Sequence, residues 1–303
     1  MYLSVFRSTF FRHVLSFLLV VGLSACSLFG GDKEKDEERE KARLLTEKQL
    51  YERIQEMLDE ERFELAVKNL QLLESRFPFG AYADQSQLEI IYAYYKNNDE
   101  QSAVAAAERF LRLHPQHRDA DYAWYMKGLA NYSIKPGVLS RFYDHDFSAR
   151  DVQPARRSFR DFQEFLRLYP DSTYAADARV RMIHIRHILA RHEVQVANYY
   201  LKRRAYTAAI NRARGVVENY QQTEAIGDAL AVLVYCYGRL DMPDDAELHA
   251  TILRENFPGH EALRANGEFV YSDVSSEGRR SLLNRVSLGL LDAPRAPQFD
   301  SRA

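Results

Sequence analysis

The sequence predicts an all-α protein, an α-solenoid of about five stacked helix pairs. Three observations carry this prediction. The 303 residues include only 13 Gly and 9 Pro, which is typical of a mostly helical chain. Apolar residues recur at helical rather than alternating spacing over most of the chain. A unit of about 32 residues also returns several times, and stacked units of this kind bury a continuous core.

The clearest unit runs from Asp84 to Pro115 and provides the frame for the others. Its two apolar stretches, separated by three polar residues, predict two short helices. Asn98, followed three residues later by Gln101, has capping-box spacing and predicts the start of the second helix. Pro115 predicts its end, because proline cannot continue a helix. Large and small side chains alternate as in the tetratricopeptide repeat at Tyr94, Ala103, Ala107, Phe110 and Pro115.

Four further units fit this frame. An insertion over residues 134–153 interrupts the third unit, and Pro243 opens the second helix of the fifth. A helical stretch over residues 174–190 fits no repeat position well. The solenoid is therefore expected over residues 46–258. Its other four units take residues 47–78, 121–170, 200–220 and 237–258.

The N-terminus has the features of an export signal. A basic start precedes an apolar run, Val14–Leu23, that is too short to span a bilayer. The run ends in Leu-Ser-Ala-Cys26, which resembles the lipobox of bacterial lipoproteins. This resemblance implies a signal peptide over residues 1–25, lipid on Cys26 as a membrane anchor, and, because Ser27 follows, an outer-membrane destination on the periplasmic face. An ordinary secretory signal with a chance cysteine is the alternative.

Composition indicates what the remaining segments of the chain can form. Residues 26–45 are highly charged and predict a solvated tether, whereas residues 259–303 predict a mobile or partner-dependent tail. With Cys26 acylated, Cys236 is the only thiol left and lies in an apolar stretch, which favours a buried structural cysteine. The 41 basic and 43 acidic residues nearly balance, so no global basic field indicates a nucleic-acid partner.

Two motifs carry a resemblance to a known family. They are Arg-Phe-Pro-Phe-Gly-Ala-Tyr over residues 76–82 and Ile-Tyr-Ala-Tyr-Tyr-Lys over residues 91–96, supported by the lipobox, the five repeats, the insertion and Tyr199-Tyr200. The chain resembles the BamD family, lipoprotein subunits of the β-barrel assembly machinery in Gram-negative outer membranes. The resemblance covers the signal and residues 44–258.

This resemblance implies a non-enzymatic scaffold with no cofactor beyond its covalent lipid. It implies that the C-terminal repeats hold the periplasmic part of BamA, next to other lipoproteins of the machinery. The N-terminal repeats are expected to receive unfolded outer-membrane proteins.

A substrate groove is expected along the first helix of each N-terminal pair. Tyrosines offer rigid amphipathic contact area for an extended aromatic-rich peptide, and Lys96 is the nearest cation for its terminal carboxylate. The alternative is that several of these tyrosines pack between helices, as Tyr94 is expected to do. The expected groove residues are Tyr51, Leu88, Tyr92, Tyr95, Lys96, Tyr122, Tyr125 and Tyr132.

A basic surface is expected on the second helix of the fourth repeat, which would carry Arg203, Arg204, Arg212 and Arg214. Guanidinium groups on a rigid helix suit an acidic partner, and the resemblance makes BamA that partner. A solvated helix face is the alternative.

No motif indicates catalysis or a bound metal. His184, His187 and His192 share a helical stretch but lack the carboxylate spacing of a metalloprotease helix. Residues 144–146, Asp-His-Asp, lack the ligand spacing and the glycine of a calcium loop. Two other functions stay open: a lipoprotein adaptor for peptidoglycan enzymes and, less favoured, a hydrolase that uses residues 144–146.

Overall fold

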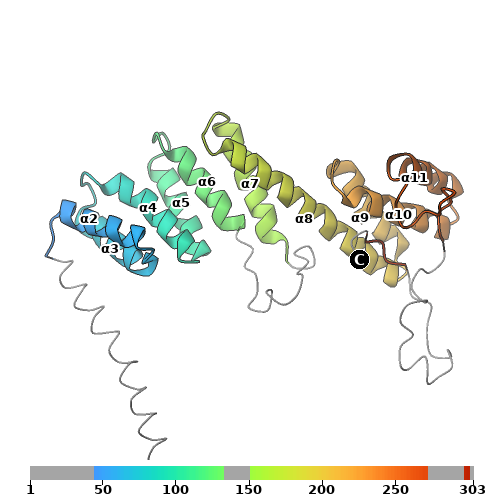
Figure 1. Cartoon of the computed structure of the whole chain (residues 1–303), viewed down its shortest axis with the longest axis horizontal. Helices are drawn as coiled ribbons and strands as arrows, with labels where there is room; N and C mark the ends of the chain where they lie inside the picture. Colours follow the sequence, from blue (N-terminus) through green and yellow to red (C-terminus); the bar gives the residue numbers. More distant parts are fainter. Residues whose placement is uncertain (1–43, 133–150, 272–296, 301–303) are drawn as a thin grey trace, which may run out of the picture. The chain divides into compact units, whose positions relative to one another are not determined.

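The computed structural model describes residues 44–132, 151–271 and 297–300 (Figure 1). These residues form ten α-helices, and their one β-type pairing is an isolated antiparallel bridge between Leu263 and Phe269. The helices follow one another as five pairs, so the all-α repeat fold is confirmed. The chain divides into two compact units, residues 1–115 and residues 116–303. The signal peptide, Cys26 and residues 134–150 of the insertion lie outside the described residues.

The first unit contains two helix pairs, α2 (Glu47–Asp59) with α3 (Phe63–Arg76) and α4 (Ala83–Lys96) with α5 (Glu100–Leu113). Helix α2 begins at a capping box, in which Thr46 Oγ1 accepts from the Gln49 backbone N–H at 3.4 Å and Gln49 Oε1 accepts from the Thr46 N–H at 3.1 Å. Apolar side chains at helical spacing fill the space between the helices. Those that are 0% exposed include Leu50, Ile54, Leu73, Ile91 and Phe110.

The second unit contains three pairs: α6 (Ala120–Tyr132) with α7 (Gln153–Leu168), α8 (Ala175–Lys202) with α9 (Tyr206–Asn219), and α10 (Ala225–Arg239) with α11 (Pro243–Asn256). Helix α10 packs against α8, α9 and α11, and every residue from Gly227 to Tyr237 is buried. Helices α6 and α7 cross at Gly128, where a Cβ would lie 2.5 Å from the Phe162 ring. The glycine therefore lets the aromatic ring fill the crossing.

The turns inside the pairs share one backbone feature. A residue with left-handed φ stands in four of them: Glu61, Asn98, Arg204 and Asp241, at φ values between 56° and 59°. None is glycine, so each turn holds a conformation that costs an L-residue some strain. The C-cap of each second helix is an aromatic or His residue. Proline follows this residue in four pairs, at positions 78, 115, 170 and 258, and Gln221 follows it in the fourth pair.

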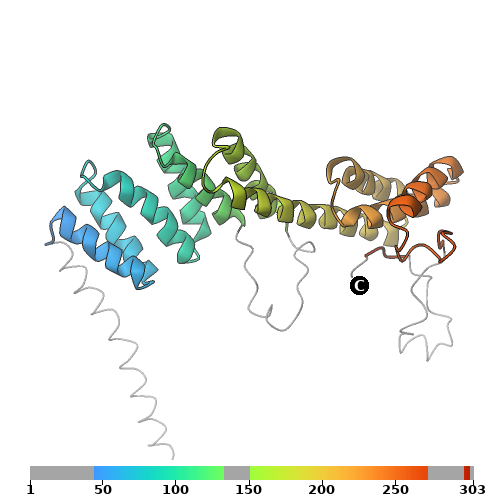
Figure 2. The ribbon, with the colours of Figure 1, turned by 45° about the horizontal axis from the view of Figure 1, so that its top comes forward.

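Two expectations about helix boundaries are wrong. Asn98 does not start α5, because its φ is 59° and the N-cap is Asp99, which accepts from the Ser102 N–H at 3.1 Å. The stretch over residues 174–190 is not a separate element, because it continues into the fourth pair as the 28-residue α8 (Figure 2). The expected boundary fails because the helical periodicity has no breaker between the two stretches.

The tail that was expected to be mobile or partner-dependent is described over residues 259–271 and 297–300, and both segments pack against the second unit. Residues 262–270 form a short hairpin, with Val270 N–H donating to Ala262 O at 2.9 Å and Gly267 at its turn with φ +81°. His260 Nε2 lies 3.0 Å from Asp228 Oδ1, and the two side chains are 4% and 9% exposed. These segments cover apolar side chains of α10. No further helix pair follows in the described residues, so the segments act as the C-terminal cap of the repeat array.

Candidate functional site

Tyr51 links two successive first helices of the N-terminal unit. Its hydroxyl donates to Glu89 Oε1 at 2.6 Å, and Gln55 Nε2 donates to the other carboxylate oxygen at 2.8 Å. Its ring stacks on Tyr82, with centroids 4.2 Å apart. Burial and the bond to Glu89 raise the pKa of the Tyr51 phenol well above its ordinary value. Tyr51 is therefore a half-buried structural residue that connects α2 to α4.

The Pro-Phe-Gly turn between α3 and α4 is held against α2. Glu47 Oε1 accepts from the Tyr82 backbone N–H at 2.9 Å. A Cβ on Gly80 would lie 2.0 Å from the same oxygen, so a larger residue would displace this carboxylate from its bond to Tyr82. The turn presents Phe79 with 98% of its surface exposed. Sequence reasoning used Phe79 as part of a family motif and did not name it as a site residue.

Tyr92 and Lys96 remain accessible on α4. Tyr92 is 36% exposed, and its ring meets Phe63 edge to face at 6.1 Å. The Lys96 ammonium lies 5.4 Å from the Phe63 ring centroid and 5.9 Å from that of Tyr92. We call these three residues the aromatic–lysine cluster. Lys96 is exposed, and its ammonium makes a cation–π contact with each of the two rings.

Two other expected groove residues on α4 differ in exposure. Leu88 is 4% exposed and belongs to the core, so its assignment to an open groove surface is wrong. Leucine occupies a position of the helix that faces the neighbouring helices, where burial of an apolar side chain is favoured. Tyr95 is half-buried, as is Tyr94, whose hydroxyl accepts from Gln71 Nε2 at 2.7 Å.

Tyr125 links α6 to the start of α8 in the second unit. Its ring stacks on Tyr174 with centroids 4.7 Å apart, and its hydroxyl donates to Asp177 Oδ2 at 2.7 Å. Burial, followed by the bond to Asp177, raises the pKa of Tyr125 to about 12. Burial opposes ionisation of Asp177, but the Arg181 guanidinium, at 2.5 Å, and the phenol lower the pKa of that carboxyl. The same arrangement of tyrosine and carboxylate thus recurs in both units.

Tyr122 and Tyr132 extend this contact between α6 and α8. Tyr122 lies 5.7 Å from the Tyr174 ring. Tyr132 lies 6.2 Å from the His184 ring, with the Arg181 guanidinium 5.6 Å from its own centroid. The alternative reading, in which tyrosines pack between helices, therefore describes Tyr122, Tyr125 and Tyr132. Whether the tyrosines of the two units line one groove stays a prediction.

The four arginines do not share one helix, which corrects the expectation. Arg203 is the C-cap of α8, and Arg204 lies in the following turn. Arg204 has a left-handed φ of 58°, which a helical residue does not adopt. Arg203 lies over the Tyr199 ring at 4.7 Å, and Tyr199 is 50% exposed. Arg212 and Arg214 are on α9, as expected. Arg214 donates to the Tyr237 hydroxyl at 2.9 Å, a bond that raises the pKa of its guanidinium.

Arg212 is engaged inside the chain by Glu193, which sequence reasoning missed. Glu193 lies on α8 with its side chain 12% exposed, and it accepts from Arg156 at 2.6 Å and from Arg212 at 3.0 Å. The bond to Glu193 raises the pKa of Arg212. The one available signal was an acidic residue at helical spacing with the apolar Leu189 and Ala197, since a carboxylate on a buried face needs a cationic partner.

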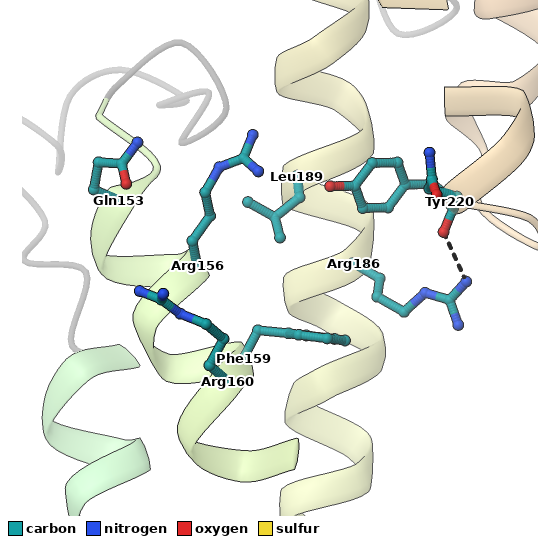
Figure 3. A pocket seen from close by; sticks show the side chains of 8 residues that line it. Gln153, Arg156, Phe159, Arg160, Arg186, Leu189 and Tyr220 are labelled. Atoms are coloured by element: carbon teal, nitrogen blue, oxygen red, sulfur yellow. Dashed lines mark hydrogen bonds between the residues drawn. The ribbon is translucent and has the colours of Figure 1, made fainter. Parts of the chain in front are cut away.

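An arginine-rich cavity lies beside this triad. Its volume is about 600 Å³, and Arg156, Arg160 and Arg186 surround an apolar wall of Phe159 and Leu189 (Figure 3). A second cavity of about 520 Å³ shares Arg156 and adds Glu193 and Arg212. We call the two cavities together the arginine cleft. The remaining lining residues are Gln153, Tyr200, Ala208, Asn211, Gly215, Asn219 and Tyr220.

Chemistry at the other candidate residues is limited. Burial raises the pKa of the Cys236 thiol to about 12, which makes it a structural rather than a reactive cysteine. Within the described ranges, no three His, Cys, Asp or Glu side chains gather as a metal site would require. None of the helices described has the length and apolar character needed to cross a bilayer. Residues 144–146 lie outside the described residues.

Comparisons with known proteins match most of this chain. The outer membrane protein assembly factor BamD of Neisseria gonorrhoeae is 39% identical over 245 residues, 81% of this chain and 91% of that protein. BamD of Vibrio cholerae is 38% identical over 208 residues, 69% of this chain and 86% of that protein. BamD of Xylella fastidiosa strain Temecula1 is 31% identical over 258 residues, 85% and 87% of the two chains.

A family model also matches the helical part. The model, YfiO, is described as an outer membrane lipoprotein and covers residues 44–252, which run from just before α2 into α11. The match therefore includes the five helix pairs except the last residues of α11. On this evidence, the chain belongs to the YfiO family of outer membrane lipoproteins, and the relatives described above are outer membrane protein assembly factors named BamD.

Proposed function

We propose that this chain is a non-catalytic scaffold for the assembly of outer-membrane β-barrel proteins. The supporting observation is the agreement between the family match over residues 44–252 and relatives named as outer membrane protein assembly factors. The scaffold is anchored by lipid on Cys26 at the periplasmic face of the outer membrane. It binds BamA through its C-terminal repeats and unfolded barrel proteins through its N-terminal repeats.

The aromatic–lysine cluster is the candidate substrate contact in the first unit. Phe63 and Tyr92 offer aromatic faces, and Lys96 supplies a cation held over them. An extended peptide that ends in an aromatic residue and a free carboxylate complements this set, since the ring stacks and the carboxylate pairs with the ammonium. The terminal strand of an unfolded β-barrel protein has this chemistry.

The arginine cleft is the candidate BamA contact in the second unit. Arg160 makes no ion pair in the part of the chain that the structure describes, and it lies beside the apolar Phe159 and Leu189. Such a surface suits an acidic side chain flanked by apolar ones, because the guanidinium supplies a directional, charged contact next to a buried apolar area. Arg203, over the exposed Tyr199 ring, is a further candidate.

The substrate contact is tested with a labelled peptide that copies the C-terminus of a barrel protein, and fluorescence anisotropy measures its Kd. Tyr92→Ala and Lys96→Gln should each weaken binding about tenfold, the loss typical of a central contact. Phe79→Ala is the matched control, because Phe79 is an exposed aromatic of the same unit outside the cluster. Unchanged affinity in both cluster variants, with helicity intact, refutes this assignment.

The BamA contact is tested by co-purification with the lipidated protein. Arg160→Glu should lower BamA capture about tenfold, because it reverses a charge at the cleft. Arg157→Glu is the control: it lies on the same helix and lines neither cavity. Arg212→Glu is a poor probe, since it would also repel Glu193. Capture of a peptidoglycan synthase or amidase in place of BamA would support the adaptor alternative instead.

A further inference from the structure

Residues 297–300 fill a socket in the second unit. Phe299 is 3% exposed, and its ring centroid lies 6.1 Å from those of both Tyr235 on α10 and Phe269 in the hairpin. Pro297 is buried as well. These residues lie beyond the range that the family model matches, and the proposed function gives them no role.

Asn198 contacts the backbone of Phe299 at both of its polar groups. Its Nδ2 donates to Phe299 O at 2.7 Å, and its Oδ1 accepts from Phe299 N–H at 3.2 Å. A neighbouring β-strand offers the same pair of bonds, so Asn198 selects an extended backbone without reading the residue type. The rings of Tyr235 and Phe269 add a preference for an aromatic side chain.

The burial of Asn198 shows that this contact is built into α8. The side chain is 3% exposed and lies on the buried face that also carries Val194 and Leu201. Its hydrogen-bond partners within the described residues are the two backbone groups of Phe299. A buried amide without partners is strongly unfavourable, whereas an apolar side chain would pack at this position without that cost.

We propose that Asn198, Tyr235 and Phe269 form a peptide-binding socket for an extended segment with an aromatic residue. Residues 297–300 occupy it in cis as an exchangeable clasp. Because the clasp is tethered to the socket, its effective concentration is on the order of millimolar. A free peptide of the same sequence therefore reaches the socket readily only when the clasp is weakened.

The test measures binding of a labelled peptide, residues 295–303, to full-length proteins by fluorescence anisotropy. The Phe299→Ala protein should bind the peptide at least tenfold more tightly than the parent protein does, because its socket lacks the aromatic ring. Adding Asn198→Leu to Phe299→Ala should abolish the binding, as should alanine in place of phenylalanine in the peptide. Phe79→Ala, which removes an aromatic that is 98% exposed, should behave as the parent.

Equal affinity of the parent and Phe299→Ala proteins overturns the proposal, and so does retained binding after Asn198→Leu. A second measurement needs no substitution. Several millimolar free peptide should raise hydrogen exchange at the Phe299 amide of the parent protein at least tenfold and leave the amides of α10 unchanged. No change at Phe299 overturns the proposal even if the variants fail to fold. Both readouts are independent of BamA and of substrate binding.

Discussion

Replacing Glu193 by Gln tests whether the carboxylate stabilises the second unit through its two arginines. The change removes the charge from two hydrogen bonds of 2.6 and 3.0 Å at a side chain that is 12% exposed. A hydrogen bond to a charged group contributes about 1.5–3 kcal/mol. Arg156 and Arg212 are 37% and 47% exposed, so solvent screening reduces each contribution by roughly half. The expected loss in the free energy of unfolding is about 2 kcal/mol.

Thermal unfolding followed by circular dichroism measures this loss, which corresponds to a decrease in Tm of about 4–8 °C for a unit of this size. Glu52→Gln is the matched control, because Glu52 pairs with Lys48 at 3.6 Å with both side chains more than half exposed. It should change stability by less than about 0.5 kcal/mol. If Glu193→Gln and Glu52→Gln have equal effects, the buried carboxylate does not stabilise the unit and the reasoning fails.

Three further predictions concern packing and ionisation. Gly128→Ala should lower the free energy of unfolding by about 2 kcal/mol in a urea titration, because its Cβ would lie 2.5 Å from the Phe162 ring. Gly215→Ala, with nothing within 4 Å, should raise it by about 0.5–1 kcal/mol, and the reverse order would contradict the described packing. The pKa of Tyr125, about 12, lies above its unfolded value near 10, so its stabilising contribution is full below about pH 10 and is lost as pH rises through about 12. Tyrosinate absorbance should show a set of late-titrating groups, and Tyr125→Phe should remove one of them while Tyr51 remains. The Cys236 thiol, with its pKa raised to about 12, should resist an aromatic disulfide reagent at neutral pH until the protein is unfolded. Labelling of the native protein would show an accessible thiol instead.

Much of the fold could be predicted because the repeat period and its prolines are local signals. Pro78, Pro115 and Pro258 each follow the end of a second helix, as expected. The helix start at Asn98 was wrong because two adjacent residues can both cap a helix. The turn places Asn98 in the left-handed region and leaves Asp99 to accept the hydrogen bond.

The site contacts were harder to predict because they join residues far apart in the sequence. Tyr51 and Glu89 are separated by 38 positions, and Tyr125 and Asp177 by 52. Helical periodicity indicates which side chains share a face and contains no information on their partners across the next helix. Only the alternative reading therefore anticipated the contacts that Tyr51, Tyr122, Tyr125 and Tyr132 make between helices, and Glu193 was missed.

The contact between Asn198 and Phe299 has a consequence for folding kinetics. It joins positions 101 residues apart, so it closes a loop of about a third of the chain. Contacts of such high sequence separation form late, after the local helix pairs that precede them. Helix α8 is therefore synthesised well before the backbone that satisfies its buried amide, and the second unit completes its core only when Phe299 has been added.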